Sequence, residues 1–174
     1  MKYLVRFIVV TFFILICTHT FAEQKIAVMD LTFVLNNSEA GKGAQDFLKK
    51  SYNNNIKKFT DMENKLKKEE SDLLTKKTVM SKEEYTKKSD ALRKKVIDYQ
   101  SQRRSSLDKI ATQRAQARET LIKKIDPILK EYIDENSISL VIDKKLTLAG
   151  RPGNDITAVI VEKLNKALPS INLK

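Results

Sequence analysis

Residues 73–85, LLTKKTVMSKEEY, decide the fold, because they lie in the middle of a long charged segment and contain neither Gly nor Pro. A helix that ran straight through them would make a rod, whereas a reversal would make a hairpin. Thr78 and Val79 are poor helix formers. Ser81 followed by Glu84 has the spacing of a capping box, in which both side chains accept hydrogen bonds from free N–H groups of a new helix. The stretch therefore predicts a reversal near residue 79.

Apolar residues on both sides of this stretch recur at heptad spacing, which is typical of a coiled-coil seam. A reversal near residue 79 pairs positions whose numbers add to about 158, so that Phe59 meets Tyr99 and Leu66 meets Leu92. The expected seam residues are Leu48, Tyr52, Phe59, Met62, Leu66, Leu73, Tyr85, Leu92, Val96, Tyr99 and Ile110. We predict an antiparallel helical hairpin over residues 40–125, with its tip near residues 76–82. Legs of about 35 residues would make an arm about 50 Å long.

The predicted arm carries the positive charge of the chain. Residues 40–125 contain 23 Lys or Arg and 12 Asp or Glu, whereas the rest of the chain after residue 22 contains 8 and 10. These lysines would keep a coiled coil soluble, or they would attract anionic partners by long-range, salt-sensitive steering. Composition therefore predicts a slightly acidic body that carries a strongly basic arm.

The first 22 residues have the features of a secretory signal peptide. Lys2 and Arg6 precede the apolar run from Phe7 to Cys17, and Thr20 and Ala22 are small residues at positions −3 and −1 of a cleavage site. An uncleaved membrane anchor is the alternative, but the run is shorter than the roughly 20 residues that span a bilayer. We expect cleavage near Ala22 and export of the mature chain to the periplasm.

Cleavage would remove Cys17 and His19, the one cysteine and the one histidine of the chain. The mature protein could then form no disulfide, no Cys or His metal site and no catalytic group based on these residues. The acidic residues of the arm alternate with lysines in the pattern of a solvated helix face. We therefore predict no catalytic residue, no metal site and no cofactor, and hence a protein that is not an enzyme.

Short segments with strand composition flank the predicted arm. KIAVMDL, residues 25–31, and SISLVID, residues 137–143, each have the length and side chains of a strand. We predict strands near residues 138–143 and 146–149, and expect the second to return on the first as a hairpin.

The remaining segments of the body are helical. A final helix is expected over residues 156–168, with Asn154 or Asp155 as its N-cap. Pro127 would kink or restart the second leg of the arm, or it would open a separate short helix. Residues 23–39 and 126–174 would together make the body.

The order of these segments resembles the Skp (OmpH) family of periplasmic chaperones. KIAVMDL, NNSEAGKG, the lysine-rich hairpin, SISLVID and GRPGNDITAVIVEKLNKAL follow one another over essentially the whole mature chain. SEAGK at residues 38–42 and DIT at residues 155–157 are the most specific local matches. The resemblance implies an α+β fold whose small β body forms by trimerisation, with one long antiparallel coiled-coil arm per subunit.

The family further implies an ATP-independent holdase. It would bind unfolded outer-membrane proteins in the cavity between three arms and keep them soluble for delivery to the outer-membrane assembly machinery. Anionic lipid or lipopolysaccharide is a further implied partner, and a nucleic-acid partner does not suit an exported protein. The expected client or anion contacts at the distal end of the arm are Lys76, Lys77, Lys82, Lys87 and Lys88. The expected body and trimer contacts are Ile26, Val28, Ile138, Leu140 and Ile142.

Two other functions are compatible with the sequence. A structural or adaptor protein of the cell envelope would dock its hairpin on a defined partner and would have little affinity for unfolded chains. A basic protein that binds nucleic acid is the other possibility, and it would require that residues 1–22 are not a signal peptide.

Overall fold

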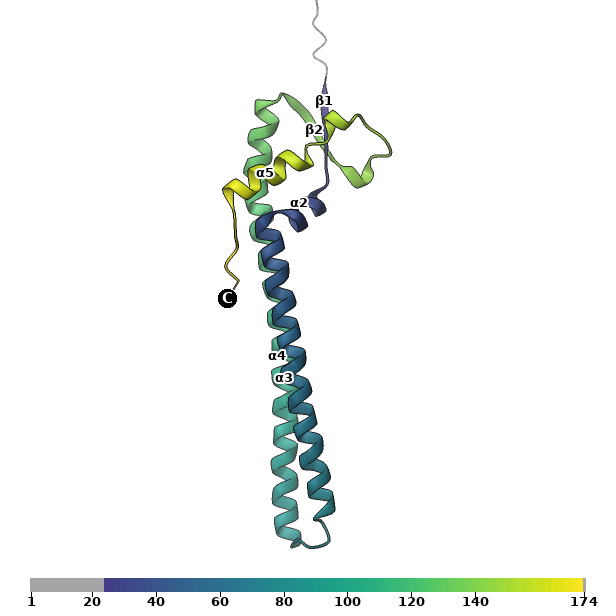
Figure 1. The fold of residues 1–174 in the computed structure, drawn as a ribbon, viewed down its shortest axis with the longest axis vertical. Helices are drawn as coiled ribbons and strands as arrows, with labels where there is room; N and C mark the ends of the chain where they lie inside the picture. Colours follow the sequence, from purple (N-terminus) through teal and green to yellow (C-terminus); the bar gives the residue numbers. More distant parts are fainter. Residues whose placement is uncertain (1–23, 174) are drawn as a thin grey trace, which may run out of the picture.

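The computed structural model describes residues 24–173, which form a long helical arm joined at one end to a small body (Figure 1). Helices α3 (Glu39–Thr75) and α4 (Lys82–Glu135) run antiparallel and make the arm. The body contains β1 (Lys25–Met29), α2 (Leu31–Asn37), β2 (Ile138–Asp143), the 3-10 turns η1 (Lys144–Leu146) and η2 (Pro152–Asn154), and α5 (Thr157–Ala167). The predicted helical hairpin is confirmed. The predicted signal peptide, residues 1–22, lies outside the described residues.

The reversal at the tip occupies residues 76–81, between the end of α3 and the start of α4. The Lys76 N–H still bonds to the Asp72 carbonyl, and the Ser81 hydroxyl then accepts the Glu84 N–H at 3.2 Å. Only the serine half of the predicted capping box is present, because the Glu84 carboxylate pairs with Lys88 at 2.8 Å. Ser81 therefore starts the returning helix.

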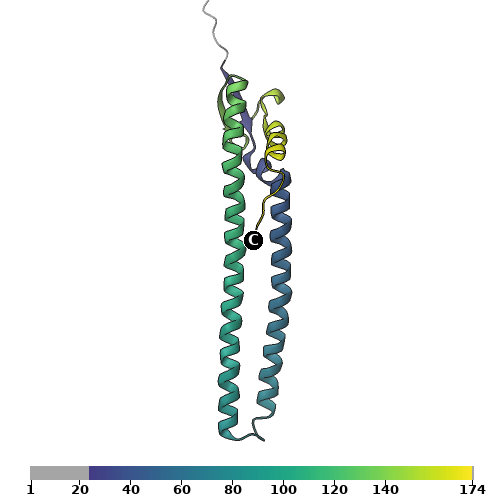
Figure 2. The same cartoon turned by 90° about the vertical axis from the view of Figure 1, so that its left-hand side faces the viewer.

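The seam between the two legs is apolar in the middle of the arm, as the heptad pattern predicts. The rings of Phe59 and Tyr99 meet edge to face, with their centroids 6.0 Å apart. Leu48, Phe59 and Ile110 are buried, and the predicted seam residues closer to the tip are half-buried. Two helices without a third layer cannot cover their seam completely. The legs lie side by side along their whole shared length (Figure 2).

Tyr52 is not buried in the seam, although its spacing from Phe59 predicts that it should be. Its side chain is 48% exposed, and Ser51 and Asn55 take the half-buried positions. The contacts nearer the body are spaced by four residues, at Ala40, Ala44 and Leu48. Such spacing departs from a strict heptad and rotates the line of contact around the helix. Ser51 then continues this line, and Tyr52 lies beside it.

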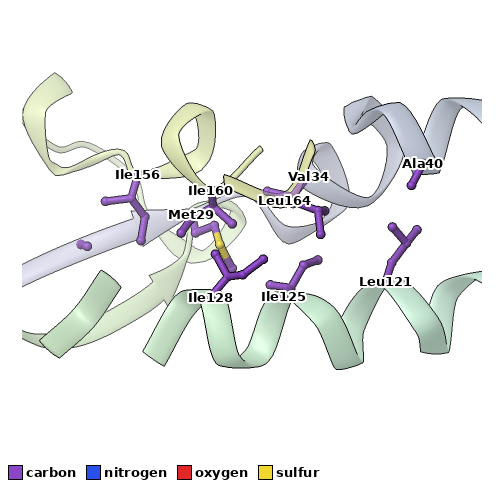
Figure 3. Packing of buried hydrophobic residues seen from close by; sticks show 10 residues of the cluster. Met29, Val34, Ala40, Leu121, Ile125, Ile128, Ile156, Ile160 and Leu164 are labelled. Atoms are coloured by element: carbon purple, nitrogen blue, oxygen red, sulfur yellow. The ribbon is translucent and has the colours of Figure 1, made fainter. Parts of the chain in front are cut away.

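The hydrophobic core lies in the body, where α4 extends beyond the start of α3 (Figures 1 and 3). Ile125 and Ile128 of α4 pack there against residues from β1, α2 and α5. Val34, Ile160 and Leu164 in this cluster are completely buried. Helix α4 is thus the second leg of the arm and also one wall of the body core.

Pro127 lies inside α4, and the helix continues through it to Glu135. A proline in a helix removes one hydrogen bond and clashes with the preceding turn, which disfavours the helix. Ile125 and Ile128 on either side of Pro127 are buried in the core, and this burial offsets the loss. The helix therefore neither restarts at this proline nor begins there as a separate element.

The two strands β1 and β2 pair in parallel, and the whole arm is the connection between them. Ile26 lies opposite Leu140, and Val28 lies opposite Ile142. On the far edge of β1, the Val28 carbonyl accepts the Ile156 N–H at 3.0 Å. Both edges of β1 are therefore engaged by segments of this chain.

The strand expected near residues 146–149 is absent, and so is the β-hairpin that it was expected to form with residues 138–143. Asp143 instead accepts a hydrogen bond from the Lys145 N–H at 2.9 Å, which starts the 3-10 turn η1. Leu146 and Leu148, whose alternation suggested the strand, are largely exposed. The expected partner, β2, pairs with β1 alone within the described residues 24–173, so the η1 turn, and not the lack of a free edge, directs residues 146–149 away from the sheet.

Helix α2 was not predicted, because its residues were divided between a strand and a break. Asp30 caps it by accepting the Phe33 N–H at 2.8 Å. Leu31, Val34 and Leu35 share one face at helical spacing and point to the core. An aspartate followed by this spacing is the signal that would have located the helix.

Gly41 and Ser38 explain why the SEAGK segment has its sequence. Ser38 is fully buried, and its hydroxyl accepts the Gly41 N–H at 3.2 Å as the N-cap of α3. A Cβ on Gly41 would lie 2.0 Å from the Leu35 carbonyl oxygen. Only glycine lets α3 start this close to the end of α2.

We expect Gly41→Ala to destabilise the protein by about 2 to 3 kcal/mol, because the new methyl group clashes with rigid backbone. Gly43→Ala is the matched control, since a Cβ there meets nothing within 4 Å. It should stabilise the helix by about 0.5 to 1 kcal/mol. Urea unfolding followed by circular dichroism measures both changes. Equal stability of the two variants would contradict the packing role of Gly41.

Candidate functional site

The candidate functional features of the described residues 24–173 are surfaces of the arm and of the body. No group of three or more metal-ligating side chains comes together in it. None of its helices is long and apolar enough to cross a bilayer. The carboxylates of the arm with perturbed pKa values, such as Glu63, have lowered pKa values chiefly because a lysine one turn away donates a hydrogen bond. Such pairs are ordinary surface contacts.

The arm presents far more surface than it buries. Helix α3 has 37 residues, which corresponds to a length of about 55 Å. Large apolar side chains such as Ile56, Leu74 and Leu107 are exposed between the charged ones. Single exposed apolar side chains are common on protein surfaces, but several of them along one basic rod make a surface suited to contact with another molecule.

The five predicted contact lysines gather at the end of the arm. Lys76, Lys77 and Lys82 belong to the reversal or flank it, and Lys87 and Lys88 lie about a turn and a half further along α4. The Lys77 ammonium lies 5.5 Å from the centre of the Tyr85 ring, and Lys88 is paired with Glu84. Val79 at the reversal itself is 82% exposed. The tip therefore presents an exposed apolar residue with lysines on both sides of it along the chain, and with Glu83 and Glu84 in the first turn of α4.

The outer face of the β1–β2 pair is apolar and has no partner within the described chain. Ile26 and Leu140, which pair across the strands, are 44% and 53% exposed. Val28 and Ile142 are the next pair on the same face and are half-buried. Ile138, the fifth predicted body contact, packs against the internal core instead. Four of the five predicted contacts therefore share one surface.

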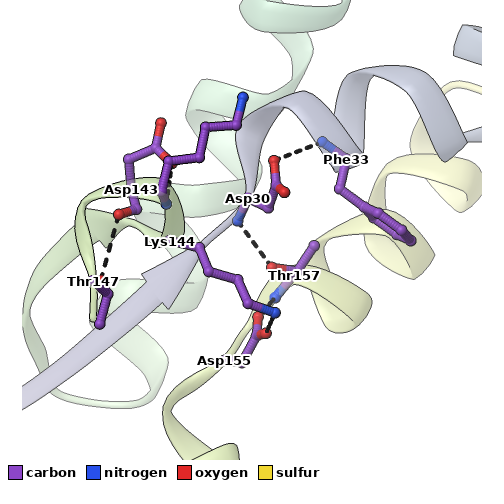
Figure 4. A network of polar contacts seen from close by, with 8 residues as sticks. Asp30, Phe33, Asp143, Lys144, Thr147, Asp155 and Thr157 are labelled. Atoms are coloured by element: carbon purple, nitrogen blue, oxygen red, sulfur yellow. Dashed lines mark hydrogen bonds and ion pairs between the residues drawn. The ribbon is translucent and has the colours of Figure 1, made fainter. Parts of the chain in front are cut away.

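A polar network joins the ends of the body segments (Figure 4). The Lys144 ammonium lies 2.6 Å from the Asp155 carboxylate, whose other oxygen accepts the Thr157 N–H at 2.9 Å. The Thr157 hydroxyl accepts the Asp30 N–H at 2.9 Å. The hydrogen bond from Lys144, followed by that from Thr157, lowers the pKa of Asp155 to about 2.

This network accounts for the DIT segment. Asp155 holds the start of α5 without being its formal N-cap residue, which is Ile156. The sequence suggested Asp155 as a cap, but it gave no sign of Lys144 or Asp30, because these residues are distant along the chain. The network fastens α5 and the η1 turn to the end of β1.

Comparison with known proteins identifies relatives over nearly the whole chain. The sequence model of a family described as outer membrane protein (OmpH-like) matches residues 25–164. The Skp-like protein of Pseudomonas aeruginosa is 25% identical over 166 residues, which cover 95% of this chain and 99% of that protein. The crystal structure of an OmpH-like outer membrane chaperone from Caulobacter crescentus superposes with a TM-score of 0.79 at 17% identity. It matches over 89% of this chain and 92% of the other.

We expect the contribution of Asp155 to folding to depend on pH. Its folded pKa of about 2 lies below the usual value of 3.8, so the contribution is present above about pH 4 and is lost as the pH falls toward 2. Solvent around the pair limits this contribution to about 1 kcal/mol. The difference in unfolding free energy between the wild type and Asp155→Asn, measured at pH 6 and pH 2.5, should shrink at the lower pH. A constant difference would show that the Lys144–Asp155 pair adds nothing.

Proposed function

Because this chain belongs to the OmpH-like family of outer membrane proteins, we propose that it is an ATP-independent holdase of the periplasm. It binds unfolded outer-membrane proteins and keeps them soluble for delivery to the outer-membrane assembly machinery. It does so without catalysing a reaction. Export follows cleavage of the signal peptide near Ala22.

The exposed, basic, two-helix arm is the observation that carries this proposal. A holdase must bind many sequences without folding them. This requires many weak contacts on a surface that is not complementary to one particular partner. The arm provides scattered apolar side chains such as Ile56 and Leu107 among its charges. Its excess of lysine and arginine would speed the capture of acidic chains before they aggregate.

The body supports assembly into a homotrimer. Two short strands make a sheet of marginal stability, and the apolar face with Ile26 and Leu140 is open to solvent in the single chain. Leu146 and Leu148 in the neighbouring loop add further exposed apolar surface. Packing these surfaces between subunits would bury them, and it would set three arms around one cavity.

The tip supports a further contact with anionic surfaces. The lysines around Val79 would meet lipid phosphates or lipopolysaccharide, while the exposed valine would reach the apolar layer beneath the headgroups. Such contact would hold the loaded chaperone at a membrane.

Leu140→Asp should convert the trimer into monomers, because three carboxylates would be buried where an apolar face is required. Sedimentation equilibrium measures the mass of the assembly. Ala158→Asp, at an exposed position of α5, introduces the same charge and should leave the trimer intact. A wild-type chain that remains monomeric at high concentration would contradict the assembly.

The holdase activity is tested by dilution of a urea-unfolded outer-membrane β-barrel protein into buffer. Light scattering should stay low when the protein is present at about three chains per client, and it should rise when the protein is absent. ATP should make no difference. A hairpin adaptor would instead leave the scattering unchanged and would bind one folded partner. Absence of suppression at a tenfold molar excess would refute the proposal.

A further inference from the structure

Three hollows lie in a row along one side of the arm. The outermost encloses about 480 Å³, the middle one about 180 Å³ and the one nearest the body about 720 Å³. Glu63 and Tyr99 line both the outermost and the middle hollow. Tyr52 lines both the middle hollow and the one nearest the body. The hollows therefore form one continuous surface, which we call the arginine side.

Each hollow on the arginine side has an arginine of α4 at its edge. Arg93 lines the outermost hollow, Arg103 the middle one, and Arg114 and Arg118 the one nearest the body. Helix α4 contains five arginines, and only Arg104 lines none of these hollows. Helix α3 has lysines and no arginine. The guanidinium groups of the arm are therefore concentrated along one surface.

These arginines are available for contact with another molecule. Arg103, Arg114 and Arg118 take part in no ion pair within residues 24–173. The ion pair of Arg93 is long, with its guanidinium 3.4 Å from the Asp90 carboxylate. The hollow that contains Lys88 and Lys95 is different. It lies on the other flank of the seam and has no arginine.

Lys88 and Lys95 are both neutralised by neighbours. Lys88 pairs with Glu84 at 2.8 Å, and Lys95 pairs with Glu69 across the seam at 2.6 Å. The opposite hollow thus has lysines as its only cations, two of them paired, whereas the arginine side adds four arginines, three of which take part in no ion pair among the described residues.

Exposed apolar side chains accompany the arginines. Tyr52 and Ile56, one turn apart on α3, and Leu107 on α4 line the middle hollow. Leu107 follows Arg103 by four residues, which places the two side chains next to each other on the helix. The other large exposed aliphatic residues of α4 also follow an arginine by four residues. Ile97 follows Arg93, and Ile122 follows Arg118.

We propose that the arginine side is the surface of the arm that binds an unfolded polypeptide segment rich in acidic and aromatic side chains. This inference rests on the proposed holdase function and assigns it to one of the two sides of the arm. A guanidinium is planar and weakly hydrated, so it stacks on aromatic rings and binds carboxylates through two hydrogen bonds. A lysine ammonium can lie over an aromatic ring, as Lys77 does over Tyr85, but it lacks the planar fork that stacks on rings and binds a carboxylate through two parallel hydrogen bonds. The apolar side chains between the arginines would contact the rest of the segment.

Charge on the arginine side complements such a segment. Its three hollows are lined by six cationic and three anionic side chains, namely Lys49, Lys67, Arg93, Arg103, Arg114, Arg118, Asp46, Glu63 and Glu70. A second copy of the same basic arm would be repelled by this surface. A surface of phosphate groups would bind the lysines of the tip as well as it binds these arginines, so it would not select the arginine side. An acidic, aromatic polypeptide is the occupant that uses the guanidinium groups and the hollows together.

The test replaces all four lining arginines by lysine, which preserves the net charge. We expect Arg93→Lys, Arg103→Lys, Arg114→Lys and Arg118→Lys together to weaken binding of a urea-unfolded outer-membrane β-barrel protein about tenfold. Fluorescence anisotropy of the labelled barrel protein in dilute urea gives the affinity. Arg104→Lys is the matched control and should leave the affinity unchanged. Circular dichroism establishes that both variants remain helical.

The outcomes separate this inference from the proposed function. If the wild type does not bind the unfolded barrel protein, both are overturned. If the wild type binds and the four-lysine variant binds equally well, only the assignment to the arginine side is overturned. Loss of binding to anionic phospholipid vesicles, or a change in oligomeric state, with client affinity unaltered would likewise overturn it.

A second measurement locates the contact without removing an arginine. The chain after residue 22 contains no cysteine, so Leu107→Cys on the arginine side and Ala91→Cys in the opposite hollow each provide one labelling site. An environment-sensitive dye at residue 107 should shift its emission to the blue when the unfolded barrel protein is added. The dye at residue 91 should shift less. An equal or larger shift at residue 91 would overturn the proposal.

Discussion

Burial of Ile125 and Ile128 against β1, α2 and α5 is the contact on which the rest of the structure depends. Both residues belong to α4, the helix that also forms the second leg of the arm. The small body therefore sets the direction of a rod several times longer than itself. Val34 and Leu164 complete this contact from the other elements, and Gly41 allows α3 to begin close enough to join the same wall. The arm is fixed at its base and depends on its own seam elsewhere.

The seam becomes less buried from the body to the tip, and this gradient is compatible with the proposed binding of unfolded chains. Near the body, Ala117 and Leu121 of α4 are fully buried, whereas Leu73 and Tyr85 close to the tip are only half-buried. A segment with few buried contacts opens more readily than a core does. The distal arm therefore combines exposed apolar surface with fewer buried contacts than the body has.

Local patterns predicted the helices of the arm and the positions of β1 and β2 well, and they predicted the segment after β2 poorly. The hairpin follows from heptads on both sides of a stretch with poor helix formers and a serine cap, all of which act within a few residues. Leu146 and Leu148 alternate like a strand, yet the Asp143 cap and the pairing of Lys144 with Asp155 bend this segment into a turn. Pro127 looked like a boundary, but burial of its neighbours carries the helix through it. Contacts with residues distant in sequence outweighed the local preference at Pro127, whereas the Asp143 cap that starts η1 is itself a local contact.

Composition and short-range periodicity are enough to predict the charged arm and the position of its reversal, and the sequence alone shows that no cysteine or histidine follows residue 22. The parallel pairing of the strands around the arm, the position of Tyr52 beside the seam and the four arginines of α4 at hollows on one side become visible only in the folded chain. These features depend on how one helix is rotated against another and on which edge of a strand is free. Such relations arise from packing between segments distant along the chain, and local periodicity does not encode them.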